Sequence, residues 1–169
     1  SRPKGKPTLD NFDSIEIDTP EISDGQVLLK TRYVSVDPYL RGRMRDEKSY
    51  IEPFQLDKPA QSGVIAEVLE TRNSEFKKGD HVNGMLEWKK FQSHTGKGLQ
   101  KVDPDKAPLS AYLGVLGLTG ITAYVGLLKI GEPKEGETVL VSGASGAVGS
   151  VVGQIAKIKG CNVVGICWK

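Results

Sequence analysis

Residues 138–166 read TVLVSGASGAVGSVVGQIAKIKGCNVVGI and contain strand-like runs, a glycine-rich turn and a stretch with helical spacing. Residues 138–142 are a short, mostly apolar run rich in β-branched side chains, which is typical of a buried parallel strand. A glycine-rich turn follows at 143–149, and a second strand-like run occupies 162–166. We therefore predict a βαβ unit, in which a helix connects two parallel strands.

The segment between the two predicted strands has the spacing of a helix. Its apolar residues recur at positions i, i+3, i+4, i+7 and i+10, so that they share one face. Gly160 stands where a glycine commonly ends a helix. The predicted apolar face consists of Val148, Val151, Val152, Ile155 and Ile158.

The glycine-rich turn carries the first chemical signal. Gly146 and Gly149 match the second and third glycines of G-x-G-x-x-G, and Ala144 replaces the first. Such a turn lets backbone amides and the positive end of a helix dipole approach a pyrophosphate. Because the motif lies between a predicted strand and helix, we expect dinucleotide binding. A purely structural turn is the alternative.

The end of the second strand bears on which nicotinamide cofactor fits. An NAD enzyme offers Asp or Glu about 20 residues after the glycines, where it binds the ribose 2′-hydroxyl. Residues 164–168 read VGICW and contain no acid, which favours NADP. Lys169 is either a phosphate partner or a solvated terminal charge, and the second interpretation is favoured.

The chain before the βαβ unit has a different pattern. From Leu9 to about Pro108, short apolar stretches alternate with turn residues, as in a small β-barrel or sandwich. Residues 76–80 form a predicted turn into a strand at His81. The boundary between the two patterns falls within 110–130. We assign residues 1–120 to one domain and 121–169 to the start of a second.

Composition excludes several classes of protein. The net charge of +2, without a basic run, does not suggest a nucleic-acid partner. Cys161 and Cys167 match neither a zinc nor a redox spacing, and no signal peptide is visible, so we expect a reduced, cytoplasmic protein without membrane partners. Residues 110–128 carry no charge, but their four glycines and several hydroxyl side chains favour two short buried helices over a membrane span.

Three segments resemble a known family. They are VSVDPYLRGRM (34–44), GLTGITAY (117–124) and the βαβ stretch, and together they resemble zinc-independent medium-chain dehydrogenases/reductases. The branch is that of prostaglandin reductases, 2-alkenal reductases and quinone-oxidoreductase-like enzymes. The resemblance implies an α/β protein in which a GroES-like β-barrel precedes a Rossmann-type doubly wound domain. With one βαβ unit, the chain looks truncated.

The resemblance also implies site residues. Thr122 would approach the nicotinamide end of NADP, and Tyr39, in the D-P-Y-x-R motif, would act as a catalytic residue lining the substrate pocket. A half-buried tyrosine without a catalytic role is the alternative for Tyr39. Trp88 is expected to serve core packing rather than the pocket. The residues implied for the pyrophosphate are Gly146, Ala147, Val148 and Gly149.

Departures from the zinc-dependent alcohol dehydrogenases argue against a metal site. Residues 36–38 and 60–63 read VDP and AQSG where those enzymes carry a cysteine and a Gly-His-Glu motif. His81 and His94 have no cysteine or histidine at ligand spacing, so no metal ligand is predicted.

The resemblance implies a reaction as well. An NADPH-dependent enzyme of this branch passes a hydride to the β-carbon of an α,β-unsaturated ketone or aldehyde, and the enolate is then protonated. Quinone reduction on the same scaffold is one alternative, and a non-catalytic nucleotide-binding adaptor is another. An isolated β-barrel interaction module is disfavoured, because the βαβ unit would then expose an apolar sheet edge. A homodimer is usual in the family.

Overall fold

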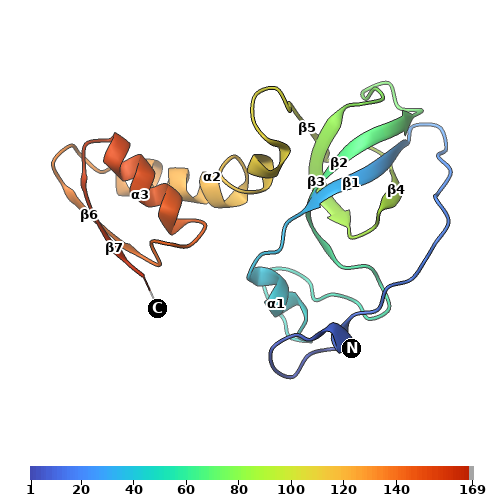
Figure 1. Ribbon diagram of the computed structural model, residues 1–169, viewed down its shortest axis with the longest axis horizontal. Helices are drawn as coiled ribbons and strands as arrows, with labels where there is room; N and C mark the ends of the chain where they lie inside the picture. The colour runs from blue at the N-terminus through green and yellow to red at the C-terminus, as the bar shows by residue number, and fades with distance from the viewer. Residues whose placement is uncertain (168–169) are drawn as a thin grey trace. The chain divides into compact units, whose positions relative to one another are not determined.

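A computed structural model describes residues 1–167 and divides into two compact units, Ser1–Pro104 and a second that begins at Asp105 (Figure 1). Trp168 ends the stretch that lacks an acid, and Lys169 is the residue for which a solvated charge is favoured over a phosphate contact; both lie outside the described residues. The division after Pro104 precedes the boundary expected within 110–130. The assignment of functions to 1–120 and 121–169 remains a prediction.

The first unit is built on one five-stranded antiparallel sheet with the strand order β4-β1-β2-β3-β5. A short 3₁₀ turn, Leu9–Asn11, precedes the sheet, and the helix α1, Tyr39–Arg43, lies between β1 and β2 along the chain. The strands are β1 (Val27–Val34), β2 (Gln61–Thr71), β3 (His81–Glu87), β4 (Phe91–His94) and β5 (Gln100–Val102).

The core of the first unit lies on one face of this sheet. Leu29 of β1 pairs with Val68 of β2, and both side chains are buried. Burying a valine or leucine stabilises a fold by about 1.5–3 kcal/mol, so this cluster accounts for the short apolar stretches between the predicted turns. The β-rich domain is therefore confirmed. The cluster contains Val27, Leu29, Val64, Ala66, Val68, Phe76, Val82 and Leu86.

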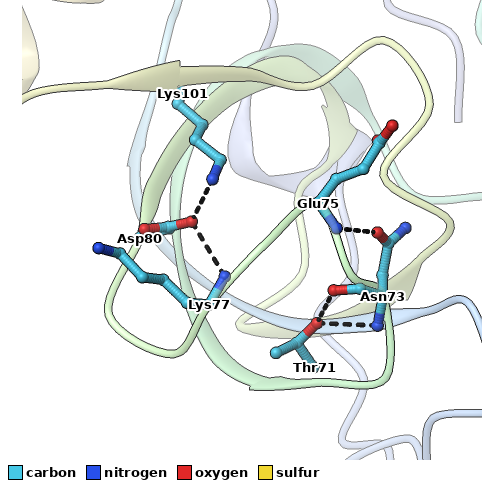
Figure 2. Close-up of polar contacts among 6 residues, drawn as sticks. All are labelled: Thr71, Asn73, Glu75, Lys77, Asp80 and Lys101. Atoms are coloured by element: carbon cyan, nitrogen blue, oxygen red, sulfur yellow. Dashed lines mark hydrogen bonds and ion pairs between the residues drawn. The ribbon is translucent and has the colours of Figure 1, made fainter.

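The turn between β2 and β3 is held by polar contacts (Figure 2). One Asp80 carboxylate oxygen accepts a hydrogen bond from the Lys77 amide at 3.0 Å and pairs with the Lys101 ammonium at 2.8 Å. The Asn73 amide donates to the Thr71 hydroxyl at 3.0 Å, and that hydroxyl donates to the Asn73 carbonyl at 2.9 Å. The predicted turn into the strand at His81 is thus confirmed.

The second unit contains the predicted βαβ arrangement. Strands β6 (Thr138–Ser142) and β7 (Asn162–Ile166) pair in parallel, with Thr138 opposite Asn162, and α3 (Gly149–Ile158) connects them. Figure 1 shows α3 alongside the two strands. Gly160 has a φ of +78°, which is the left-handed conformation expected after the helix. The other elements of this unit are a 3₁₀ segment (Leu109–Leu113), α2 (Leu118–Tyr124) and a π-helical segment (Val125–Gly131).

The uncharged run at 110–128 forms short helical segments, as expected, and none of the helices within residues 1–167 is long and apolar enough to cross a membrane. The expectation that these helices are buried is wrong. Leu118 and Ile121 of α2 are 68% and 57% exposed, although α2 contacts α3. Ile158, at the end of the predicted α3 face, is also exposed, where the chain turns back at Gly160.

Candidate functional site

The glycine turn lies at the carboxyl ends of β6 and β7. Gly143 leaves β6 with a φ of +61°, a conformation that glycine adopts without a steric penalty. Its carbonyl accepts a hydrogen bond from the Gly146 amide at 2.9 Å. The Ala144 amide donates to the Ile166 carbonyl at 3.0 Å, which ties the turn to the end of β7. The turn is therefore fixed at the edge where open α/β sheets bind ligands.

Gly149 begins α3 in close contact with this turn. A Cβ on Gly149 would lie 2.3 Å from the Gly143 carbonyl oxygen and 3.0 Å from the Ala144 Cα. Real Cβ atoms do not approach backbone this closely, so the site accepts only glycine without moving the turn. This is the role of the third glycine in dinucleotide-binding turns, which is close packing of helix against strand.

The amides at the start of α3 face no protein acceptor. Between residues 1 and 167, no protein group accepts a hydrogen bond from the backbone amides of Ala147 and Val148, and the first turn of α3 carries no acidic side chain. Gly146 and Ala147 are exposed. Free amides, an accessible backbone and the positive end of a helix dipole suit a diphosphate. The residues present therefore fit the pyrophosphate of a dinucleotide.

Thr122 lies on α2, which packs against α3 in the same unit. Its hydroxyl donates to the Leu118 carbonyl at 2.7 Å, so the proton is engaged and the oxygen remains able to accept a hydrogen bond. Only glycine at position 120 lets the backbone before α2 come this close to the helix, because a Cβ there would stand 1.7 Å from the Val115 carbonyl oxygen. The start of α2 therefore packs closely against the segment that precedes it.

Tyr39 begins α1 in the first unit, directly after Pro38, and its ring is half-buried. Pro38 is the N-cap residue of this helix, the Asp37 carbonyl before it accepts a hydrogen bond from the Leu40 amide at 3.0 Å, and the Ser35 hydroxyl donates to the Asp37 carboxylate. Burial raises the pKa of Tyr39, the Asp37 charge raises it further, and the Arg43 charge offsets part of this effect. The phenol therefore stays protonated at neutral pH and can donate a hydrogen bond.

Arg43 is the residue of this region that the sequence interpretation did not single out. It follows Tyr39 by four residues on α1, so the two side chains share one helix face. Its side chain is 7% exposed, which is unusual for arginine. The i to i+4 spacing within YLRGR was the signal that could have indicated it.

The histidines and Trp88 take structural positions. The His94 Nδ1 accepts from the Gly96 amide at 2.9 Å, and His81 opens β3. Within residues 1–167, no three His, Cys, Asp or Glu side chains form a group that could hold a metal ion. Trp88 donates its indole N–H to the Ser62 hydroxyl at 2.8 Å while remaining 37% exposed, so the expected core packing is only partial.

The predicted site residues thus fall in two groups. Gly146, Ala147, Val148 and Gly149 form one continuous turn at the carboxyl ends of β6 and β7, and Thr122 lies in the same unit. Tyr39 belongs to the first unit. Their roles in binding and catalysis remain proposals.

A family model described as the N-terminal domain of oxidoreductase matches residues 1–102. The chain belongs to this oxidoreductase family. The resemblance to the zinc-independent medium-chain dehydrogenase/reductase superfamily is confirmed, and with it the GroES-like assignment of the β-rich unit.

The chain is similar throughout its length to reductases. A putative NADP-dependent oxidoreductase, YfmJ, from Bacillus subtilis is 61% identical over 98% of the chain and 48% of the relative. A 2-alkenal reductase (NADP(+)-dependent) from Nicotiana tabacum is 47% identical over 90% of the chain and 45% of the relative. The structure of CurA from Vibrio vulnificus in complex with NADPH superposes with a TM-score of 0.91 at 44% identity, covering all of the chain and 50% of CurA. The chain therefore spans about half the length of the curated relatives it matches.

Proposed function

We propose that the chain is the N-terminal part of an NADPH-dependent oxidoreductase that reduces the C=C bond of α,β-unsaturated ketones and aldehydes without zinc. In this proposal, residues 1–120 form the substrate and catalytic domain, and residues 121–169 begin the NADP-binding domain. The observation that carries the proposal is the fixed glycine turn with free amides. It is supported by the 47% identity of the chain to a 2-alkenal reductase (NADP(+)-dependent).

The second unit supplies cofactor binding. The amides of Ala147 and Val148 would donate to the pyrophosphate, and Gly146 and Gly149 leave room for it against the backbone. Bound NADPH would supply the hydride for the β-carbon of the substrate. The Thr122 oxygen would accept a hydrogen bond at the nicotinamide end of the cofactor.

The first unit supplies a hydrogen-bond donor. A phenol whose pKa is raised by burial remains neutral at pH 7, so Tyr39 would donate a hydrogen bond to the substrate oxygen as negative charge develops there. Hydrogen bonding in a site closed to water takes the place of a metal in stabilising that oxygen. Tyr39 would act as this electrostatic partner, with its orientation set by α1.

The test is NADPH consumption by the whole protein against a panel of enones, 2-alkenals and quinones, with NADH as the control cofactor. We expect enone and alkenal turnover with NADPH preferred, and a loss of about 10- to 100-fold in kcat/KM for Tyr39→Phe, which removes one hydrogen-bond donor. Tyr33→Phe is the matched control, because Tyr33 is a half-exposed strand tyrosine of the same unit.

Two other outcomes decide between the alternatives. Turnover of quinones alone would favour a quinone reductase on the same scaffold. NADPH binding without turnover of any compound in the panel would favour a nucleotide-binding adaptor and overturn the enzyme proposal. The homodimer expected from the family is tested separately, by the mass of the whole protein in solution.

A further inference from the structure

The connection between α1 and β2 has no regular secondary structure but is firmly bonded. We call residues 44–60 the α1–β2 loop. A loop of this length carries many backbone carbonyls that neither a helix nor a sheet satisfies. Arginine side chains donate to several of these carbonyls, and Arg43 makes the most buried of these contacts.

Arg43 bonds the middle of the loop and the strand residue that follows it. Its Nε donates to the Glu52 carbonyl at 2.9 Å, within the loop. Its Nη1 donates to the Gln61 carbonyl at 2.9 Å, on the first residue of β2. A single planar guanidinium therefore connects α1, the middle of the loop and the sheet.

Phe54 completes the arrangement. The Arg43 guanidinium lies over its ring at 4.1 Å from the centroid, and the Phe54 amide donates to the Arg43 carbonyl at 2.7 Å. Arg2, from the N-terminus, donates to the Met44 and Phe54 carbonyls at 3.5 and 3.2 Å. The loop is thus bonded by two arginines, Arg2 and Arg43. Of these, Arg43 is the one that lies on the same helix as Tyr39.

The loop brings a second tyrosine toward Tyr39. Tyr50 is an exposed residue of the loop and the weakest of the groups that raise the pKa of Tyr39, while Arg43 lowers the pKa of the same phenol. Arg43 lies four residues after Tyr39 on α1, so the two side chains share one helix face, and the loop that Arg43 bonds adjoins the Tyr39 side of this helix.

We propose that Arg43 is a positioning residue: it holds the α1–β2 loop against α1 and β2, and thereby shapes the substrate side of Tyr39 without contacting substrate. The inference rests on the proposed function, because it takes Tyr39 to face the substrate. Arg43 would therefore affect the KM for the substrate indirectly, through the position of the loop.

The first measurement is independent of activity. Trypsin cleaves after Arg45 and Lys48 of the loop only when the local backbone opens. In the whole protein, Arg43→Gln should accelerate this cleavage at least about tenfold, since it removes hydrogen bonds from a charged donor. Arg41→Gln is the matched control, because Arg41 lies on the same helix but donates to the Pro3 and Gly5 carbonyls, outside the loop.

The second measurement is steady-state kinetics on the enone that the wild-type protein reduces best. Arg43→Gln should raise KM about tenfold with a smaller change in kcat, while KM for NADPH stays the same. Arg43→Lys keeps the charge but cannot bond both carbonyls in one plane, so it should fall between the wild type and Arg43→Gln. If Arg43→Gln fails to fold by circular dichroism, Phe54→Leu provides the test, since it removes the stacked ring and leaves both carbonyls in place.

The outcomes are distinct. Unchanged cleavage in a folded Arg43 variant overturns the proposal that Arg43 holds the loop. Faster cleavage with unchanged KM and kcat overturns its role in the substrate site. If the wild-type protein reduces no enone or alkenal, the proposed function fails and the positioning role fails with it, while the trypsin result still decides whether Arg43 holds the loop.

Discussion

Gly149 approaches Gly143 so closely that a Cβ on Gly149 would stand 2.3 Å from the Gly143 carbonyl oxygen. The same carbonyl accepts the Gly146 amide at 2.9 Å and thereby sets the shape of the proposed pyrophosphate turn. Any side chain at 149 must displace this oxygen. Helix packing and turn geometry thus depend on one glycine.

We expect Gly149→Ala to weaken NADPH binding by at least about tenfold and to lower the free energy of unfolding by about 1–3 kcal/mol, the cost of overpacking a close contact. Fluorescence titration with NADPH and urea denaturation measure the two effects. Gly153→Ala on the same helix is the control. The nearest atom to its added Cβ is 3.6 Å away, so it should be neutral or stabilise the helix by up to about 1 kcal/mol. Equal effects of the two substitutions would contradict the assignment of the turn.

Gly120 poses a similar problem in α2, where an added Cβ would meet the Val115 carbonyl oxygen at 1.7 Å. Gly120→Ala must move residues 115–118 or the start of the helix, and we expect a loss of about 2–4 kcal/mol in the free energy of unfolding. Gly126→Ala, which meets no atom within 4 Å, is the control and should cost less than about 0.5 kcal/mol. A Gly120 variant as stable as the control would show that the segment before α2 is not packed as described.

The accuracy of the sequence-based predictions differed between local and non-local features. Both strands of the βαβ unit, 138–142 and 162–166, were predicted with the bounds that the structure gives, because apolar runs and glycine punctuation are local signals. The glycine-rich turn at 143–149 was predicted for the same reason. By contrast, the exposed side of α2 was not predicted, since an uncharged sequence does not show which of its faces finds a packing partner.

The surroundings of Tyr39 illustrate what the sequence left out. The motif indicated the tyrosine, but the pKa of its phenol depends on Asp37, Arg43 and Tyr50, which a turn, a helix and a loop bring together. Arg43 forms its contacts with Glu52 and Gln61, which are 9 and 18 residues away. No periodicity predicts such contacts, because they arise only once the α1–β2 loop has folded back on α1.

His94 should make stability depend on pH below neutrality. Burial lowers the pKa of His94, and its Nδ1 accepts from the Gly96 amide only when the ring is neutral. The unfolded chain therefore binds a proton first, so stability is complete above the unfolded pKa of about 6.5 and is lost as the pH falls from there toward the folded pKa. We expect a loss of about 1 kcal/mol, measured by urea denaturation across this range.

His94→Leu should flatten this part of the pH profile. His81→Gln serves as the control, because His81 lies in β3 and is not the acceptor of the Gly96 amide. If the pH dependence of stability changes equally in both variants, it does not arise from the His94 hydrogen bond.

Asp80 should make stability depend on pH in the acidic range. Burial acts to raise the pKa of Asp80, but hydrogen bonds from the Lys101 ammonium and the Lys77 amide, together with both lysine charges, outweigh it and lower the pKa. The folded carboxylate thus releases its proton more readily than the unfolded one. Its contribution to stability is present above the unfolded pKa of about 3.9 and is lost as the pH falls through the folded pKa.

Asp80→Asn should therefore be less stable than the wild type by about 1 kcal/mol at pH 7, and this difference should shrink as the pH falls below about 4. Figure 2 offers a matched control in Glu75, whose backbone amide bonds the Asn73 side chain while its carboxylate makes no contact with the residues drawn. Glu75→Gln removes a carboxylate from the same turn and should leave the stability at pH 7 within about 0.5 kcal/mol of the wild type.

Because Lys101 is half-exposed, salt should weaken its pairing with Asp80 and reduce the Asp80→Asn difference. A difference that persists unchanged at pH 3 and in high salt would mean that Asp80 stabilises the turn through packing rather than through its charge.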